Sequence, residues 1–230
     1  QLGAGYRMRS WLGRRGIGAL AAASNVTGVK SDVTGLARLL HAHDAILCLD
    51  CAASAPYLPI DMHPAGQPDA GIDAVFFSPH KFIGGPGACG ILLFNEALYR
   101  RDLPPTQSAG GTVRYVTKTG HDFIEEIEPR ERAGTPGVPQ IVRAALALLL
   151  RDTLVTFFRR HPTPLTPGAT EQDCLRAYQR LLGDTASVVY LGQLTDAWTR
   201  PAWAHRPTSP EQVQARYEQW RQLRTTEVGS

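Results

Sequence analysis

The stretch FFSPHKFIGGPGACGILLF, residues 76–94, decides which fold the chain is expected to adopt. An apolar run ends at Ser78, His80 and Lys81 follow at once, and a glycine-rich turn leads to a second apolar run. Short apolar runs bounded by turn residues are typical of buried strands. A lysine at the buried end of a strand loses hydration, which favours the neutral amine that can attack a carbonyl carbon. The alternative is a surface lysine in a loop before a tight turn, and spacing alone does not separate the two.

The residues beside Lys81 suit the recognition of an anion. Ser78 and His80 can donate hydrogen bonds to a phosphate, and the glycines at positions 84, 85 and 87 allow the backbone to come close to it. A nucleotide-binding protein that uses GGPG as its phosphate loop is a weaker alternative, because the G-K-[ST] ending of such a loop is missing.

A second informative segment is ILCLDCAASAPY, residues 46–57, in which Asp50 closes an otherwise apolar strand. Buried acids are normally paired. One interpretation is therefore structural, with Asp50 as a helix cap or as the partner of an unidentified arginine. The functional interpretation is that Asp50 pairs with a protonated pyridine nitrogen and holds that ring cationic as an electron sink.

The first half of the chain alternates strand and helix patterns, which predicts an α/β fold. Strands are expected at residues 17–24, 45–49, 73–77 and 89–94, and the continuous apolar character of 45–49 indicates a strand covered on both faces. Asp32 is expected to cap a helix with Val33, Leu36, Ala37 and Leu40 on one face. The segments SNVTG, DCAAS and SPHKFIGGPG follow three of the strands, so they should converge on one crevice at the carboxyl ends of a parallel sheet.

The second half is expected to be mainly helical. A long helix is predicted from about Pro139 to Phe158, and the segment HPTPLTPG, residues 161–168, breaks regular structure with three prolines. Beyond it we predict a helix at 171–182, a strand at 187–191 and a helix at 209–224.

Composition excludes several classes of protein. The formal net charge of +3 comes from 24 basic and 21 acidic residues with no basic run, so no nucleic-acid partner is expected. No apolar run approaches the ~20 residues of a membrane-spanning helix. Four scattered cysteines indicate a reducing intracellular compartment, the cytoplasm or an organelle. No metal site is expected at the Cys48–Cys51 pair. The chain has three lysines, and we expect Lys30 and Lys118 to lie outside the crevice that holds Lys81.

The ordered segments SNVTG, the acid-containing strand, S-x-H-K with its glycines, GGTV and R-E-R-x-G-T-P together resemble the aminotransferase class V and cysteine desulfurase family of fold type I enzymes. The resemblance covers residues 18–157. It implies an aspartate aminotransferase-like fold with a mostly parallel sheet and crossover helices. Residues 1–158 would be the C-terminal half of the large domain, 159–170 a proline-rich linker, and 171–230 part of a small α+β domain.

The resemblance also implies roles for individual residues around pyridoxal 5'-phosphate (PLP). Lys81 would form the internal aldimine, and Asp50 would pair with the pyridinium nitrogen. Asn25 would lie near the phenolic oxygen of the cofactor or near the substrate, and Ser78 and His80 would bind the phosphate. The implied activity is that of a PLP-dependent enzyme acting on a small amino acid, desulfurase-like or aminotransferase-like.

Thr112, in the segment GGTV, resembles a residue that family members offer to the phosphate in the neighbouring subunit, which implies a symmetric homodimer. The sequence also departs from the family, because Ala53 stands where many desulfurases carry a glutamine. No counterpart is recognised for the family's N-terminal phosphate-binding turn and stacking ring, for its substrate-binding arginine or for the desulfurase cysteine. The rival expectation is therefore a catalytically inactive fragment or a non-enzymatic relative of the PLP fold.

Overall fold

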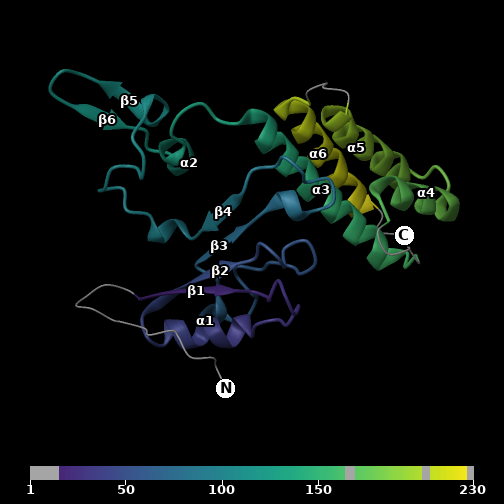
Figure 1. The fold of residues 1–230 in the computed structure, drawn as a ribbon, viewed down its shortest axis with the longest axis horizontal. Helices are drawn as coiled ribbons and strands as arrows, with labels where there is room; N and C mark the ends of the chain where they lie inside the picture. The colour runs from purple at the N-terminus through teal and green to yellow at the C-terminus, as the bar shows by residue number, and fades with distance from the viewer. Residues whose placement is uncertain (1–15, 164–168, 204–207, 227–230) are drawn as a thin grey trace. The chain divides into compact units, whose positions relative to one another are not determined.

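The computed structural model describes residues 16–163, 169–203 and 208–226 (Figure 1). The chain divides into two compact units. One contains residues 1–93 and 139–230, and the other contains residues 94–138. The larger unit carries the sheet and the long helices.

The sheet has four strands in the order β1-β2-β3-β4. These are β1 (Gly16–Ala21), β2 (Ala45–Asp50), β3 (Ala74–Phe77) and β4 (Ile91–Phe94). β1 pairs with β2 in parallel, and β2 pairs with β3 in parallel. All four strands lie within or beside the ranges predicted from the sequence, and the predicted α/β fold with a mostly parallel sheet is confirmed.

The crossover from β1 to β2 is the helix α1 (Val33–His41), which lies beside these strands (Figure 1). Asp32 caps it as predicted, because its carboxylate accepts a hydrogen bond from the Gly35 amide at 2.9 Å. Leu40 packs directly on β1. A Cβ on Gly18 would lie 2.5 Å from a methyl carbon of Leu40, so the glycine is what allows helix and strand to approach.

The two faces of the sheet are covered unequally along β1 to β3. Residues of β2 alternate between buried and half-buried, with Leu47 and Leu49 on the buried face. On the other face, Ile17 is 67% exposed and Phe76 is 38% exposed. The prediction that strand 45–49 is covered on both faces is therefore wrong for this chain. An apolar run shows that a strand can be buried on both sides, whereas its burial depends on what packs there.

A polar cluster ties the end of α1 to the start of β3. The ring of His41 contacts the Asp73 carboxylate through Nε2 at 2.8 Å and the Asp69 carbonyl oxygen through Nδ1 at 2.9 Å. Asp73 also accepts a hydrogen bond from the Leu47 amide at 2.8 Å. Because both partners of the ring are acceptors, the geometry fits the doubly protonated imidazolium. The hydrogen bond to Asp73 accordingly raises the pKa of His41 above its ordinary value.

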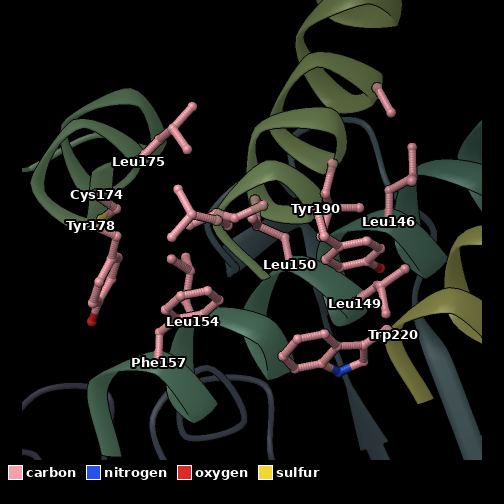
Figure 2. Close-up of a cluster of buried hydrophobic side chains, with 14 of the residues drawn as sticks. Leu146, Leu149, Leu150, Leu154, Phe157, Cys174, Leu175, Tyr178, Tyr190 and Trp220 are labelled. Carbon is pink, nitrogen blue, oxygen red and sulfur yellow. The ribbon is translucent and has the colours of Figure 1, made fainter. Parts of the chain in front are cut away.

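The long helix α3 (Val138–Arg160) matches the predicted helix. Its residues contribute to two hydrophobic clusters. Its residue Ala147 is fully buried against the cluster around the sheet. Other residues of α3, including Leu146 and Leu150, belong to a second cluster with α4 (Glu171–Leu182), α5 (Ala186–Trp203) and α6 (Pro210–Thr226). Figure 2 shows this cluster, in which the rings of Tyr190 and Trp220 stack with centroids 5.4 Å apart.

The helices α4 and α6 confirm the predicted helices, but the predicted strand at 187–191 is wrong. That segment lies inside α5. Its five residues SVVYL form a short apolar run, and such a run does not distinguish a strand from a buried helix. Leu191, Leu194 and Ala197 continue the buried positions at helical spacing. Within the described part of 171–230 no strand is present. Residues 164–168 of the predicted linker lie outside the described residues.

The smaller unit is built around a buried arginine. It contains the hairpin of β5 (Val113–Val116) and β6 (His121–Phe123) and the short helix α2 (Ile127–Glu131). The guanidinium of Arg130 donates to the carbonyl oxygens of Arg101, Leu103 and Ile124 and lies 5.2 Å from the centroid of the Phe123 ring. These contacts close the loops of this unit on one another.

In the described residues, no helix of the chain combines the length and apolar character needed to cross a membrane.

Candidate functional site

Three strand ends lie in register at one edge of the sheet. Ala21 pairs with Asp50, and Asp50 pairs with Phe76. The segments that follow these positions carry Asn25, the 52–58 loop and Lys81. Since neighbouring parallel strands end side by side, their loops meet at this edge, as the sequence predicts.

The loops enclose a cavity of about 460 Å³ that brings two predicted site residues, Asn25 and Lys81, together. Asp50, Ser78 and His80 do not line it. The lining residues come from the loop after β1, the loop after β2 and the turn after β3: Ala23, Ser24, Asn25, Gly28, Lys30, Ala53, Ser54, Pro56, Tyr57, Leu58 and Lys81. A cavity of similar volume, about 460 Å³, lies among the C-terminal helices and carries none of the predicted residues.

Lys81 is the last residue of a 3-10 turn, Pro79–Lys81, that follows β3. The Lys81 amide donates to the Ser78 carbonyl oxygen at 3.0 Å and so fixes the backbone of this turn. The side chain is exposed, so the expected loss of hydration is wrong for this chain. The strand ends at Phe77, and the turn carries the lysine past the buried edge of the sheet.

The glycine-rich turn packs on the backbone beside Lys81. A Cβ on Gly85 would lie 1.8 Å from the Pro79 carbonyl oxygen, whereas Gly84 and Gly87 adopt positive φ values of 75° and 79°. Gly84 and Gly87 therefore provide the backbone conformation of the turn, and Gly85 allows two backbone segments to come close. The predicted approach of these glycines to a phosphate stays a prediction, and in this structure Gly85 lies close to the backbone of the Lys81 turn.

Asp50 is half-buried at the end of β2. One carboxylate oxygen, Oδ1, accepts a hydrogen bond from the Ala52 amide at 2.8 Å, which closes a turn. The structural interpretation of Asp50 as a cap is thus correct for one oxygen. No arginine or lysine pairs with Asp50 among the residues that the structure describes.

The loop after β1 folds back on itself and contributes a residue that the sequence did not predict. Ala23 forms an antiparallel bridge with Lys30, and the Ser24 hydroxyl accepts from the amides of Val26 and Thr27. Gly28 makes the reversal with a φ of 71°. Lys30 therefore lines the same cavity as Lys81, and the prediction that it lies outside the crevice is wrong. The glycine in SNVTG was the available signal for this reversal.

The loop after β2 forms the opposite wall and is held by α3. The guanidinium of Arg151 donates to the carbonyl oxygens of Pro56 and Leu58 at 3.4 and 3.2 Å. Ser54 is buried at the base of this loop, and Tyr57 is 81% exposed at the cavity. Neither Arg151 nor Tyr57 carries a sequence signal for this placement.

The aminotransferase class-V family model matches residues 14–172 of the chain, which is more than half of its length. The chain belongs to the aminotransferase class V family. The matched range contains all of the motifs on which the resemblance was based and ends within α4.

Curated relatives of this class V chain include probable cysteine desulfurases. The one from Aeropyrum pernix is 34% identical over 147 residues, which cover 62% of this chain and 34% of that protein. The one from Staphylococcus epidermidis is 31% identical over 155 residues, which cover 67% and 36%. The chain thus spans about a third of the length of these relatives. Among solved structures, the cysteine desulfurase CsdA from Escherichia coli is 26% identical, with coverage of 60% of this chain and 38% of that chain and a TM-score of 0.47.

Thr112 of the segment GGTV lies in the smaller unit and is fully buried. Its hydroxyl donates to the Ala109 carbonyl oxygen at 2.8 Å and accepts from the Ala109 amide at 3.1 Å. A contact from this hydroxyl to a neighbouring subunit would require the turn to open. The predicted homodimer, with Thr112 at the neighbouring site, stays a prediction.

Proposed function

We propose that this chain is the cofactor-binding part of a PLP-dependent enzyme that acts on a small amino acid, as a cysteine desulfurase or a class V aminotransferase does. The observation that carries the proposal is the shared cavity at the carboxyl edge of the sheet. Lys81 and Asn25 reach it from different loops, and both are residues to which the resemblance gives a role at the cofactor.

The side chains around this edge fit PLP because their polar groups are not engaged elsewhere. Within the described residues, the Lys81 ammonium has no ion pair, and the Ser78 hydroxyl and His80 ring have no hydrogen-bond partner. Asp50 keeps one carboxylate oxygen open. This edge of the sheet thus offers an amine for an aldehyde, a carboxylate for a pyridine nitrogen and two hydrogen-bond donors for a phosphate.

PLP, when bound, supplies an aldehyde for covalent attachment and a ring that withdraws electrons from the substrate's α-carbon. The Nζ atom of Lys81 would hold the cofactor and would move a proton at that α-carbon. Asp50 Oδ2 would pair with the ring nitrogen and keep it protonated. The Asn25 amide would lie near the phenolic oxygen or the substrate, and Ser78 and His80 would donate to the phosphate.

Borohydride trapping tests this proposal. The purified chain is incubated with PLP, reduced, digested and analysed by mass spectrometry, and the pyridoxyl group should be found on Lys81. Lys30→Arg should leave that adduct in place, and Lys81→Arg should remove it. Lys118, on the smaller unit, reports the background reaction of an exposed lysine. Modification of Lys30 or Lys118 in preference to Lys81 would refute the assignment.

A second candidate is a chain that binds PLP without turning over an amino acid. The exposure of Lys81 favours it, because water around the amine weakens the charge stabilisation on which this chemistry depends. Sulfide release from cysteine and amino transfer from alanine distinguish the two candidates. Turnover comparable to that of a full-length relative would exclude the second.

A further inference from the structure

The helix α3 contacts the loops of both residues that the proposed function assigns to opposite ends of the cofactor. Lys81 would hold the aldehyde and Asp50 would pair with the ring nitrogen, and these two groups lie on opposite sides of a rigid pyridine ring. The amine and the carboxylate must therefore keep a fixed separation. The sheet sets the register of the two strand ends, but the loops that follow need further contacts to hold their positions.

The first contact is between α3 and the glycine-rich turn. The Arg143 guanidinium covers Gly87, because a Cβ built on that glycine would overlap with its Nη1 atom. Gly85 of the same turn lies against the backbone of the 3-10 turn that ends at Lys81. The path from α3 to the Lys81 backbone thus runs through two close contacts at glycines, which leave little room for adjustment.

The second contact is between α3 and the loop after β2. The Arg151 guanidinium donates to the carbonyl oxygens of Pro56 and Leu58, and the loop closes on itself through backbone hydrogen bonds. At the start of this loop, the Ala52 amide donates to Asp50 Oδ1 at 2.8 Å. The Asp50 carboxylate is therefore oriented by a loop that Arg151 holds at its far end.

The two arginines lie on one stripe of α3. Arg143, Ala147 and Arg151 follow one another at intervals of four residues, which places them on the same side of a helix. Ala147 is fully buried against the cluster around the sheet, so this stripe faces the sheet. Two helical turns separate the arginines by about 12 Å along the axis, and that separation is fixed by the hydrogen bonds of the helix.

The opposite side of α3 is held by the C-terminal helices. Leu146 and Leu150 are fully buried in the cluster with α4, α5 and α6. A helix packed on two sides cannot shift along its axis without breaking close-packed contacts. The helices beyond residue 160, which carry none of the predicted site residues, thereby keep α3 in place.

We propose that α3 sets the separation between the Lys81 amine and the Asp50 carboxylate, with Arg143 and Arg151 as its positioning residues. The inference rests on the proposed function. Arg143 acts on the end of the site that holds the aldehyde, and Arg151 acts on the end that holds the ring nitrogen. Because the two contacts reach different loops, their loss has different consequences.

The experiment removes each arginine separately from the 230-residue chain. Arg151→Met keeps the length of the side chain and removes its donors. The affinity for PLP should fall roughly threefold to tenfold, since two hydrogen bonds that hold the binding-competent loop are lost. NMR of PLP with an isotope-labelled ring nitrogen should show that part of the bound population has lost the proton on that nitrogen. The borohydride-trapped adduct should still form on Lys81 at saturating PLP.

Arg143→Met should give the converse result. The yield of the Lys81 adduct should fall roughly threefold or more at saturating PLP, while the ring nitrogen of the bound cofactor stays protonated. Arg151→Lys keeps a charged donor but cannot bridge two carbonyl oxygens, so its readings should lie between those of Arg151→Met and the unaltered chain. Arg159→Met, at an exposed position of the same helix, is the matched control and should change neither reading.

Hydrogen exchange in the PLP-free chain separates this inference from the proposed function. Arg151→Met should speed the exchange of the Ala52 amide, whether or not the chain binds PLP; if that substitution unfolds the chain, Arg151→Lys should show the same change to a smaller degree. Unchanged exchange at Ala52 would overturn the inference. Equal losses at both ends of the cofactor in both variants would also overturn it, because the arginines would then support only the fold. Absence of the Lys81 adduct in the unaltered chain would refute the proposed function, whatever the exchange at Ala52.

Discussion

The backbone of Gly85 touches the turn that carries Lys81, because a Cβ built on Gly85 would lie 1.8 Å from the Pro79 carbonyl oxygen and 3.0 Å from the His80 Cα. The contact is between two backbones, so no side-chain movement can relieve it. The Gly85 amide also donates to the Phe82 carbonyl oxygen at 2.9 Å. The glycine-rich turn thus fixes the position of the Lys81 backbone relative to the end of β3.

Gly85→Ala should destabilise the chain and move Lys81. Forcing a methyl group into this contact should lower the free energy of unfolding by roughly 1–3 kcal/mol. Urea unfolding measures that loss, and the yield of the trapped pyridoxyl adduct on Lys81 should fall with it. The matched control is Gly110→Ala, since nothing lies within 4 Å of a Cβ at that position. If the two variants unfold at the same urea concentration, the backbone contact is not the constraint that we describe.

Asp50→Asn should separate the structural role of this residue from its role toward the cofactor. An asparagine Oδ1 can still accept from the Ala52 amide, so the free energy of unfolding should change by less than about 1 kcal/mol. The amide cannot hold a pyridine nitrogen protonated, and the affinity for PLP should fall about tenfold. Asp50→Ala removes both interactions and should lower stability as well. Equal PLP affinity in the unaltered chain and in Asp50→Asn would leave Asp50 with a structural role alone.

The strands and loops of the site could be predicted from the sequence because their signals are local. Each strand is an apolar run, and each ends at a polar or glycine-rich segment. The prediction of a strand at 187–191 was wrong because five apolar residues fit both the period of a strand and that of a buried helix. The buried positions at Leu194 and Ala197 were needed to reveal the helix. The prediction that Lys30 lies outside the crevice was wrong because its position depends on a loop reversal, which is set by Gly28 and by the bridge to Ala23.

The exposure of Lys81 could not be predicted for a different reason. Burial depends on which segments pack over a strand end, and that information is not local to the residues around the lysine. The same holds for the face of the sheet that carries Ile17 and Phe76. An apolar sequence indicates which surfaces favour burial, and the surrounding chain decides which of them are covered.

The unequal faces of the sheet predict unequal costs of truncation. Leu47 is fully buried, so Leu47→Ala should lower the free energy of unfolding by about 2–5 kcal/mol. Ile17 is 67% exposed, and Ile17→Ala should cost less than about 1 kcal/mol because little apolar surface returns to water. Urea unfolding of the two variants under one set of conditions provides the comparison. Similar losses would mean that the face carrying Ile17 is covered in solution.

The His41–Asp73 contact predicts that part of the stability is lost at alkaline pH. The hydrogen bond to Asp73 raises the pKa of His41 above its ordinary value of 6.5, so the folded state favours the protonated ring. This contribution is fully present below the unfolded-state pKa and is lost as the pH rises through the higher folded-state pKa. The free energy of unfolding should therefore fall as the pH rises above the ordinary value of 6.5, and His41→Gln should flatten that decline. His43→Gln is the control, since His43 contacts only the Leu39 carbonyl oxygen among the described residues. A decline that persists unchanged in His41→Gln would assign the pH dependence to other groups.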